Sequence, residues 1–393
     1  MNDQSKTRRA AWLYNPTYRN LFYQALVVGG LFWFLYTITG NVLNNLEARG
    51  ISTGFRFLNQ PAGFAIAQTL VEYNETYTFG RTFVVGLLNT LLVSAMGIVS
   101  ATFLGLFLGI SRLSPNWLLR KLCAVYIETF RNIPLLLQIF FWYYAVLQTL
   151  PGPRNAINFG GESFFLSIRG FYSPKPIPEP TFAIYVGLIV AAVIGLIVLA
   201  RWAKKRFIAT GEQFPVLPTT IGVMLGTIVI GYFITGRPLS FEYPVLRGFS
   251  FAGGMRIIPE LMALWFALTI YTSTYIAEIV RSGIQAVAHG QTEACRALGL
   301  TEKQRLNLVV LPQAMRVMIP PMTSQYLNLA KNSSLAVAIG YPDLVAVFMG
   351  TTLNQTGQAI EIVAMTMLVY LTISLSVSAF MNWFNKRVAL VER

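Results

Sequence analysis

The chain has 393 residues, of which 54% are hydrophobic and 12% are charged, with 30 lysine and arginine residues against 16 acidic ones. Soluble proteins carry about 25% charged residues, so the composition excludes an ordinary soluble protein and indicates a polytopic helical membrane protein. One histidine and two cysteines are too few for the usual haem, zinc or iron–sulfur ligand sets, and no Gly-Lys dipeptide provides a Walker A loop. We therefore expect no metal site, no cofactor and no catalysis on this chain.

Long apolar runs recur along the sequence, and a bilayer core takes about 20 helical residues to cross. These runs predict eight transmembrane helices, at residues 21–43, 82–111, 122–150, 182–200, 218–235, 259–280, 317–349 and 359–385. The seventh contains Pro320, Pro321, Lys331 and Asp343, so we expect a broken helix or a helix followed by a re-entrant segment. The loop at 151–181 is rich in glycine and proline, which favours irregular, partly extended structure.

The basic residues are distributed unequally between the two sides that these spans define. With the N-terminus in the cytoplasm, the inner segments hold 19 lysine and arginine residues and the outer loops hold 9. This asymmetry follows the positive-inside rule and explains the net charge of +14 without a nucleic-acid partner. We expect a multi-pass protein of a bacterial plasma membrane with both termini cytoplasmic.

The longest inner loop, residues 286–312, separates the sixth and seventh spans. Its sequence predicts a short helix over 292–298, with Thr292 able to cap the start and Gly299 able to end it in the left-handed conformation. One face of this helix would carry Ala294, Ala297 and Leu298, and another Glu293 and Arg296. A helix this short must be held by its neighbours, and its apolar stripe suits a groove on another protein.

The same loop resembles the EAA signature of bacterial ABC importer permeases, EAA-x3-G-x9-I-x-L-P. Cys295 replaces the second alanine of that signature and Val309 replaces its isoleucine. In that family the loop forms a coupling helix that docks onto a separate ATPase subunit, which binds the ATP and magnesium. The residues to which the resemblance assigns this coupling are Glu293, Ala294, Cys295, Arg296, Gly299, Leu311 and Pro312.

Residues 126–138, 275–284 and 329–335 narrow the resemblance to the polar amino-acid uptake permeases of the histidine/glutamine type. The likeness covers about 82–150 and 259–390 and implies the transmembrane fold of type I ABC importers, an all-α membrane fold. It divides the chain into an N-terminal tail, extra helix and outer loop (1–81), a first core part (82–150), an insertion with two extra helices (151–258) and a second core part (259–393).

This long form is similar to the larger permease of general L-amino-acid importers. The implied partners are a dimer of ATP-binding subunits, a second homologous permease in a hetero- or homodimer, a periplasmic amino-acid-binding protein and membrane lipid. The implied function is a permease that moves amino acids by alternating access. The alternatives are an ion-coupled secondary transporter, which would need no ATPase-docking loop, and a membrane scaffold, which would not need Lys331 in mid-span.

Intramembrane ionisable residues are costly and mark candidate functional positions. Glu128 and Arg131, like Glu278 and Arg281, stand three residues apart on a predicted helix, so each pair can neutralise itself. We interpret both pairs as structural ion pairs that hold the third and sixth spans together; the alternative is direct contact with substrate.

A second set of polar residues lies deep in the seventh span. Asn328, Lys331 and Asn332 share one helical face, where an ammonium and amide donors could bind the carboxylate of an amino acid. The alternative is hydrogen bonding between helices. The full set of substrate-lining candidates is Asn89, Thr90, Tyr275, Gln325, Asn328, Lys331, Asn332 and Ser333.

Overall fold

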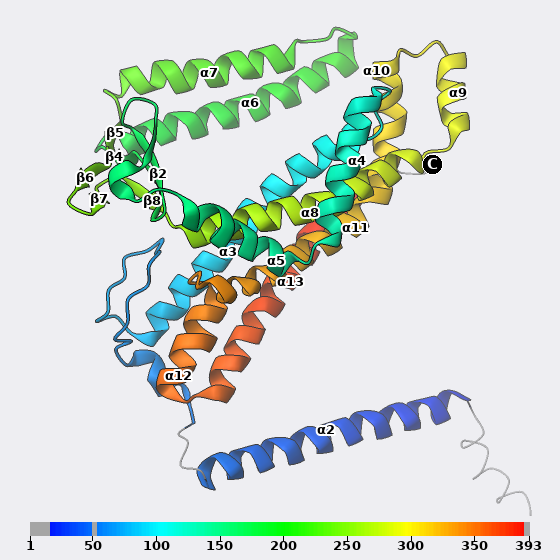
Figure 1. Ribbon diagram of the computed structural model, residues 1–393. Coiled ribbons are helices and arrows are strands. Elements are labelled where there is room, and N and C mark those ends of the chain that lie inside the picture. Colours follow the sequence, from blue (N-terminus) through cyan, green and yellow to red (C-terminus); the bar gives the residue numbers. More distant parts are fainter. Residues whose placement is uncertain (1–15, 49–52, 389–393) are drawn as a thin grey trace, which may run out of the picture. The chain divides into compact units, whose positions relative to one another are not determined.

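The computed structural model describes residues 16–48 and 53–388, and its membrane part is helical, as predicted (Figure 1). Within the described residues, six helices are long and apolar enough to cross a membrane, or seven if one bent pair is counted as a single span. The six helices are α2 (Pro16–Ala48), α3 (Phe79–Ser111), α6 (Phe182–Thr210), α7 (Val216–Ile234), α8 (Pro259–Gln285) and α13 (Ala359–Val388). They correspond to six of the eight predicted spans.

The predicted third span is bent at Pro134. The helix α4 (Trp117–Asn132) makes an angle of 103° with the helical segment Leu135–Thr149. That segment consists of α5 (Leu135–Phe140), the π-helix η2 (Phe141–Val146) and the 3-10 turn η3 (Leu147–Thr149). Proline has no N–H, so the carbonyl of Phe130 loses its helical partner. Gln138 replaces that partner, because its Nε2 donates to the Phe130 oxygen at 2.8 Å and to the Ile133 oxygen at 3.0 Å.

The predicted seventh span is broken, as expected, but not at its prolines. Pro320 and Pro321 lie inside α11 (Leu311–Asn332), which continues into the 3-10 helix η6 (Ser333–Ile339). The break falls at Gly340, whose φ of 74° is left-handed and accessible to glycine. Asp343 then accepts a hydrogen bond from the Ala346 N–H at 2.8 Å and so starts the π-helix η7 (Val345–Thr352), which ends in α12 (Leu353–Thr356).

By its contacts the chain divides into two units, one of 1–92 with 342–387 and one of 93–341 with 388–393. The first unit has an apolar core made of Phe57, Ala62, Phe79, Leu344, Phe348 and Ile362. The start of α3 approaches the 343–344 backbone closely in this unit. A Cβ added to Gly86 would lie 3.0 Å from the Leu344 Cα, so glycine permits that approach.

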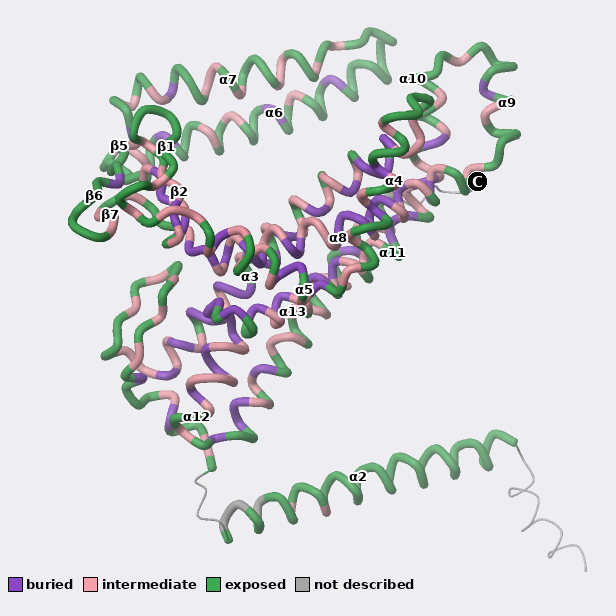
Figure 2. Tube along the Cα trace, viewed as in Figure 1, coloured by how far each residue is buried: buried purple, intermediate pink, exposed green. Residues whose placement is uncertain are grey.

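The second unit is built around α8, which packs against α4, α5 and α11 and is among the most buried helices (Figure 2). The helix α3 reaches α8 through a Gly-x-x-x-Gly pair, Gly105 and Gly109. A Cβ added to Gly105 would lie 2.6 Å from the Ile276 Cβ, and one added to Gly109 would lie 2.7 Å from the Ala277 oxygen. Small residues at this spacing let the two backbones approach closely, as is common between membrane helices.

The inserted segment of the second unit is a helical hairpin, α6 and α7, with small antiparallel sheets. A four-stranded sheet has the order β1 (Ile157–Phe159), β2 (Phe164–Ser167), β3 (Gly170–Ser173) and β8 (Met255–Ile257). The other pairs are β4 (Lys175–Pro178) with β5 (Leu239–Glu242), and β6 (Val245–Arg247) with β7 (Ser250–Ala252). The loop at 151–181 is thus more regular than predicted, because β1, β2 and β3 pair with one another and β3 and β4 also pair with strands that follow both helices.

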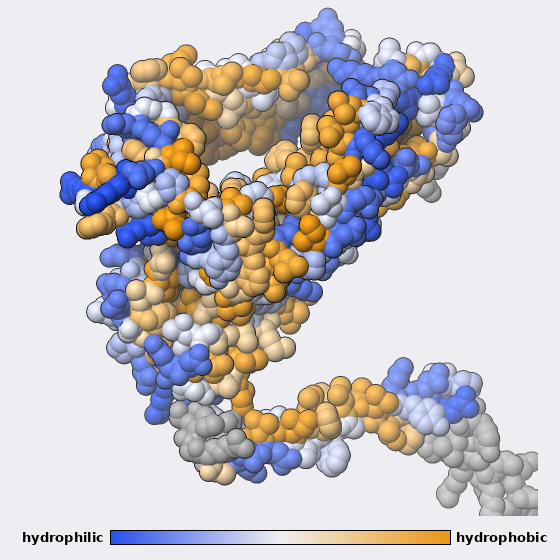
Figure 3. Space-filling model, in the orientation of Figure 1, coloured by the Kyte–Doolittle hydropathy of each residue, from blue (hydrophilic) through white to orange (hydrophobic). Residues whose placement is uncertain are grey.

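Three of the apolar helices are little buried among the described residues. In the apolar windows of α2, α6 and α7, at most 6% of the residues are buried. Hydrophobic residues, coloured orange, make up much of the visible faces of α2 and α7 (Figure 3). Such surfaces suit lipid or another membrane helix, as expected for spans added to a helical core.

Candidate functional site

The short helix predicted in the 286–312 loop is present as α9 (His289–Ala297), but it begins earlier than expected. Its N-cap is Ala288, with no side-chain capping bond, so the expectation that Thr292 caps the helix is wrong. Thr292 lies inside the helix, where its hydroxyl accepts a hydrogen bond from Arg305 Nη1 at 3.2 Å. The Thr292 hydroxyl, which we expected to cap the helix, therefore contacts the segment that follows α9 instead.

The end of α9 is where the sequence places it. Gly299 is left-handed with φ +71°, which confirms the predicted stop. The N–H of Leu300 donates to the Cys295 oxygen and that of Gly299 to the Arg296 oxygen, both at 3.0 Å. These two bonds form the Schellman motif, which satisfies carbonyls that the last helical turn leaves open.

The next segment braces α9. Thr301 and Gln304 form a capping box at the start of α10 (Glu302–Arg305). Glu302 contacts Arg305 at 2.6 Å and Arg296 of α9 at 3.7 Å. The hydrogen bond from Arg305 lowers the pKa of Glu302, which keeps this carboxylate ionised as the link between the two helices.

The two faces of α9 differ in exposure. Ala294, Ala297 and Leu298 are exposed, with Leu298 at 78%, whereas Cys295 is 4% exposed. The cysteine that departs from the EAA pattern therefore faces the protein, and the apolar stripe is open. After the π-helix η5 (Leu306–Val310), Leu311 and Pro312 begin α11. The loop is thus a braced unit with an unpartnered apolar face.

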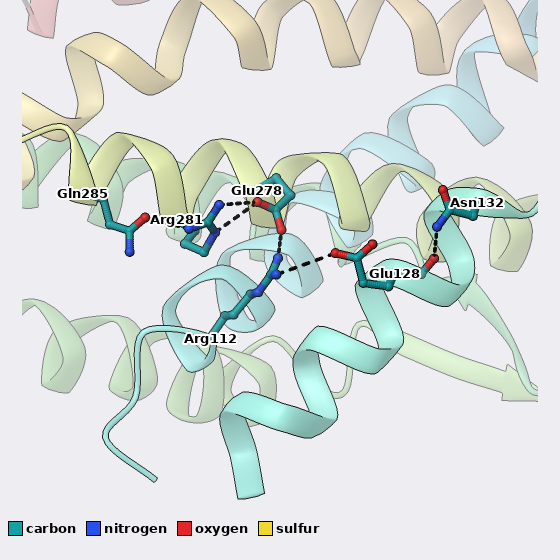
Figure 4. Close-up of polar contacts among 6 residues, drawn as sticks. All are labelled: Arg112, Glu128, Asn132, Glu278, Arg281 and Gln285. Carbon is teal, nitrogen blue, oxygen red and sulfur yellow. Dashed lines mark hydrogen bonds and ion pairs between the residues drawn. The ribbon is translucent and has the colours of Figure 1, made fainter. Parts of the chain in front are cut away.

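Four charged residues form a network where α3, α4 and α8 meet (Figure 4). Arg281 pairs with Glu278 at 2.9 Å, as the spacing predicts. Arg112, which follows α3, contacts Glu278 of α8 and lies 3.7 Å from Glu128 of α4. Because the network joins three helices, its geometry supports the structural interpretation of these acidic residues.

The predicted pair of Glu128 with Arg131 is replaced by other contacts. Glu128 faces Arg112, and the Arg131 guanidinium lies over the Tyr275 ring, 5.6 Å from its centroid. The Tyr275 hydroxyl is 3.0 Å from that of Tyr271. Sequence spacing finds partners within one helix but cannot find Arg112, which comes from another element; its position at the end of a span was its only signal.

Asn89 and Thr90 are fully buried and hold the backbone around Asp343. The Asn89 side chain donates to the Pro342 oxygen at 2.8 Å and to the Gln68 oxygen at 2.9 Å. The Thr90 hydroxyl accepts from the Leu344 N–H at 3.0 Å and donates to the Gly86 oxygen. Both side chains are bonded to backbone groups in the described chain, and the expectation that these two residues line a substrate path stays a prediction.

The polar face of α11 is open in this chain. Asn328 and Lys331 are exposed and Gln325 and Asn332 are half-buried, whereas Leu329 and Ala330 of the same turns are buried. Ser333 is buried and donates to the Ala330 oxygen at 2.8 Å, which gives it a local structural role. The substrate-lining candidates that keep open polar groups are therefore those centred on Asn328 and Lys331.

Comparison with known proteins gives a consistent assignment. Residues 101–390 match the model of the family described as binding-protein-dependent transport system inner membrane component. The putative amino-acid ABC transporter permease protein YhdX of Escherichia coli is 53% identical, over 96% of this chain and 96% of that protein. The general L-amino acid transport system permease protein AapQ of Rhizobium johnstonii is 50% identical, over 97% and 95%. A solved amino acid ABC transporter structure is 20% identical over 79% of this chain and 95% of that one, with a TM-score of 0.46.

Proposed function

The chain belongs to the family of binding-protein-dependent transport system inner membrane components, and we propose that it carries amino acids as the permease subunit of an ATP-driven importer. Support for the cargo comes from the names of YhdX and AapQ, both amino-acid permeases that match over nearly their whole length. Membership of this family leaves the alternative of an ion-coupled secondary transporter without support.

The observation that carries the proposal is the α9–α10 loop. A short helix with a fixed left-handed stop, braced by Arg305 and Glu302 and open on its Leu298 face, is suited to transmit force from a docked partner. We propose that this face docks onto a dimer of ATP-binding subunits, which hydrolyse ATP with magnesium. The permease itself then needs no catalytic group, and closure of the ATPase dimer tilts α8 and α11, which flank the loop.

We further propose that the Asn328–Lys331 face of α11 lines the amino-acid path. A lysine exposed to hydrocarbon in mid-span would be strongly disfavoured, so this face must meet water or protein. A second, homologous permease subunit across from α11 would enclose a watery path there. The ammonium would then bind the α-carboxylate, a group that all amino acids share, and other walls would select the side chain.

The remaining partners follow from the same proposal. A periplasmic amino-acid-binding protein would deliver the substrate to the outer side, and both termini would lie in the cytoplasm of a bacterium, as the distribution of basic residues favours. The membrane is the inner membrane that the family description names, and we propose that it is that of a bacterium.

Substitution of Leu298 tests the docking proposal. Leu298→Asp places a charge on the exposed apolar face of α9 and should reduce copurification of the ATP-binding subunit at least about tenfold, since apolar contact is lost and a carboxylate is desolvated. Leu246→Asp, which changes an exposed leucine of β6, serves as the matched control and should leave copurification unchanged. Equal copurification of both variants with wild type would refute docking through α9.

A further inference from the structure

A basic pocket lies where the end of α3, the start of α4 and the last turns of α8 meet. Its volume is about 320 Å³, and its lining residues are Arg112, Trp117, Arg120, Lys121, Ala124, Arg281 and Gln285. Four of these seven residues are cationic, and all seven belong to one unit of the chain. The pocket is separate from the α9 loop and from the polar face of α11.

The cations of this pocket are only partly neutralised. Glu278 serves both Arg112 and Arg281, and Glu128 lies 3.7 Å from Arg112. Arg120 and Lys121 are exposed, and neither makes an ion pair with any residue in the described part of the chain. Burial, and then the neighbouring Arg281, lowers the pKa of Arg112, which indicates that this site would gain from a bound anion.

The position of Arg120 and Lys121 on their helix adds a second reason. Asn116 caps α4 by accepting from the Leu119 N–H, so both cations lie within the first turns after this cap. The start of a helix is its positive end, and no acidic residue stands in the first turn of α4 to balance the two cations. An anion in the pocket would offset both the helix dipole and the side-chain charges.

The surroundings indicate which kind of anion the pocket meets. Trp117 is 65% exposed, and Leu118, Leu122 and Val125 are exposed along one face of α4. Tryptophan favours the headgroup level of a membrane, and an exposed apolar helix face favours acyl chains. The pocket therefore places cations beside a surface suited to lipid tails, which fits an amphiphile with an anionic head better than a soluble anion.

We propose that this pocket binds the phosphate headgroup of an anionic phospholipid from the cytoplasmic leaflet. The proposal rests on the cytoplasmic placement of the segment between α3 and α4. Arg120 and Lys121 would contact the phosphate, Trp117 would mark the interface, and Leu118 and Leu122 would contact an acyl chain. Because Arg112 and Arg281 of the same pocket also join α3 to α8 through Glu278, the bound headgroup would stiffen this helix junction.

Native mass spectrometry of the purified complex tests the proposal, with phosphatidylglycerol and phosphatidylcholine as the probes. The wild type should bind phosphatidylglycerol in preference to phosphatidylcholine. The double variant Arg120→Gln/Lys121→Gln should bind phosphatidylglycerol about tenfold or more weakly, since each cation contributes to attraction of an anionic lipid. The double variant Arg201→Gln/Lys205→Gln, which changes two exposed cations of α6, should bind like wild type.

Three outcomes would overturn the proposal. Equal binding of phosphatidylglycerol and phosphatidylcholine would exclude a site selective for an anionic headgroup. Displacement of phosphatidylglycerol by millimolar inorganic phosphate would show a site for a soluble anion. Unchanged lipid binding with loss of the ATP-binding subunit in Arg120→Gln/Lys121→Gln would show a protein contact. Thermal unfolding of each variant, measured alongside binding, distinguishes the loss of the lipid site from misfolding of the chain. The lipid result does not depend on the transport proposal, so failure of that proposal would leave it unaffected.

Discussion

The side chain of Gln138 supplies the hydrogen-bond donor that the backbone lacks at Pro134. Its Nε2 donates to the Phe130 and Ile133 oxygens while the residue is only 4% exposed. Water cannot easily reach these carbonyls, and the 103° bend leaves them without helical partners. A single amide therefore permits the sharp turn between α4 and α5.

Gln138→Leu should destabilise the protein by about 1–3 kcal/mol, because it removes two hydrogen bonds and leaves buried acceptors unpaired. The measurement is the midpoint of thermal unfolding in detergent. Gln213→Leu changes an exposed glutamine between α6 and α7 and should leave the midpoint unchanged. If both variants have the same unfolding midpoint as wild type, the carbonyls at the bend have another hydrogen-bond donor.

Lys331→Met should weaken uptake of all amino acids together, by about ten- to hundredfold, if the ammonium binds the shared α-carboxylate. This range corresponds to the roughly 1.5–3 kcal/mol of a charge-assisted hydrogen bond. The measurement is uptake per assembled complex, with the amount of intact complex determined alongside. Lys331→Arg keeps the charge and should retain most of the uptake.

The matched control is Lys386→Met, which removes an exposed lysine near the end of α13 and should not alter uptake. Poor assembly of Lys331→Met would indicate instead that the lysine neutralises an acid in the partner subunit. Normal assembly of Lys331→Met with unchanged uptake of every amino acid tested would refute the proposal that Lys331 binds the α-carboxylate of the substrate.

At the scale of elements, the α9–α10 loop, to which we assign coupling in the proposed function, depends on one backbone conformation. Gly299 has φ +71°, and nothing lies within 4 Å of a Cβ built on it, so a substitution meets backbone strain but no steric clash. Gly299→Val should cost about 1–2 kcal/mol in the left-handed region and disrupt the Schellman motif of a helix too short to persist alone.

We expect Gly299→Val to insert normally into the membrane but to lose most of its substrate-stimulated ATPase activity. Gly290→Val is the control, since Gly290 lies inside α9 with open space around it and no positive φ. Activity equal in the two variants would show that the stop of α9 is not needed for coupling.

These elements also show what the sequence can predict. The Gly299 stop and the Glu278–Arg281 pair depend on residues within one or two turns, so spacing alone was enough to find them. Asn89 bonds Pro342 and Thr90 bonds Leu344, across most of the chain, and polarity in a span could not distinguish this structural role from a substrate contact. Sequence spacing did not identify Arg112 either, because its partners Glu128 and Glu278 lie on other helices.

The break in the seventh span shows another limit. Pro320 and Pro321 are the strongest helix-breaking signals in that sequence, yet they lie within α11, and the chain turns at Gly340. Proline disturbs a helix through its missing N–H, whereas glycine permits the left-handed turn itself. The turn after Gly340 is held by bonds from Asn89 to Pro342 and between Thr90 and Leu344, and these contacts are long-range.

At the scale of the whole molecule, strand pairing constrains the topology of the insertion. The strand β3 pairs with β8, and β4 pairs with β5, so the segments before α6 and after α7 meet in shared sheets. They must then lie on the same side of the membrane, and the turn between α6 and α7 must lie on the other. This constraint does not depend on counting charges, yet it agrees with the predicted arrangement.

Cysteine labelling of intact cells tests that topology. In a background with Cys123→Ala and Cys295→Ala, both of which replace buried free cysteines, Glu162→Cys and Arg247→Cys should react with a membrane-impermeant maleimide. Lys204→Cys should react only after the cells are opened. The first two positions lie in the outer loops joined by the strands, and the third lies near the end of α6, on the side where basic residues are concentrated.

Each pattern of labelling has a distinct meaning. Reaction of Lys204→Cys in intact cells, with the other two positions protected, would show that the chain has the opposite orientation in the membrane. The α9 loop would then lie outside the cytoplasm, and a cytoplasmic ATPase could not reach it. Labelling of Glu162→Cys but not Arg247→Cys would contradict the pairings of β3 with β8 and of β4 with β5. These pairings keep the segment before α6, which contains Glu162, and the segment after α7, which contains Arg247, on the same side of the bilayer. The expected pattern places the α9 loop on the cytoplasmic side, because α8 returns the chain across the membrane after β8.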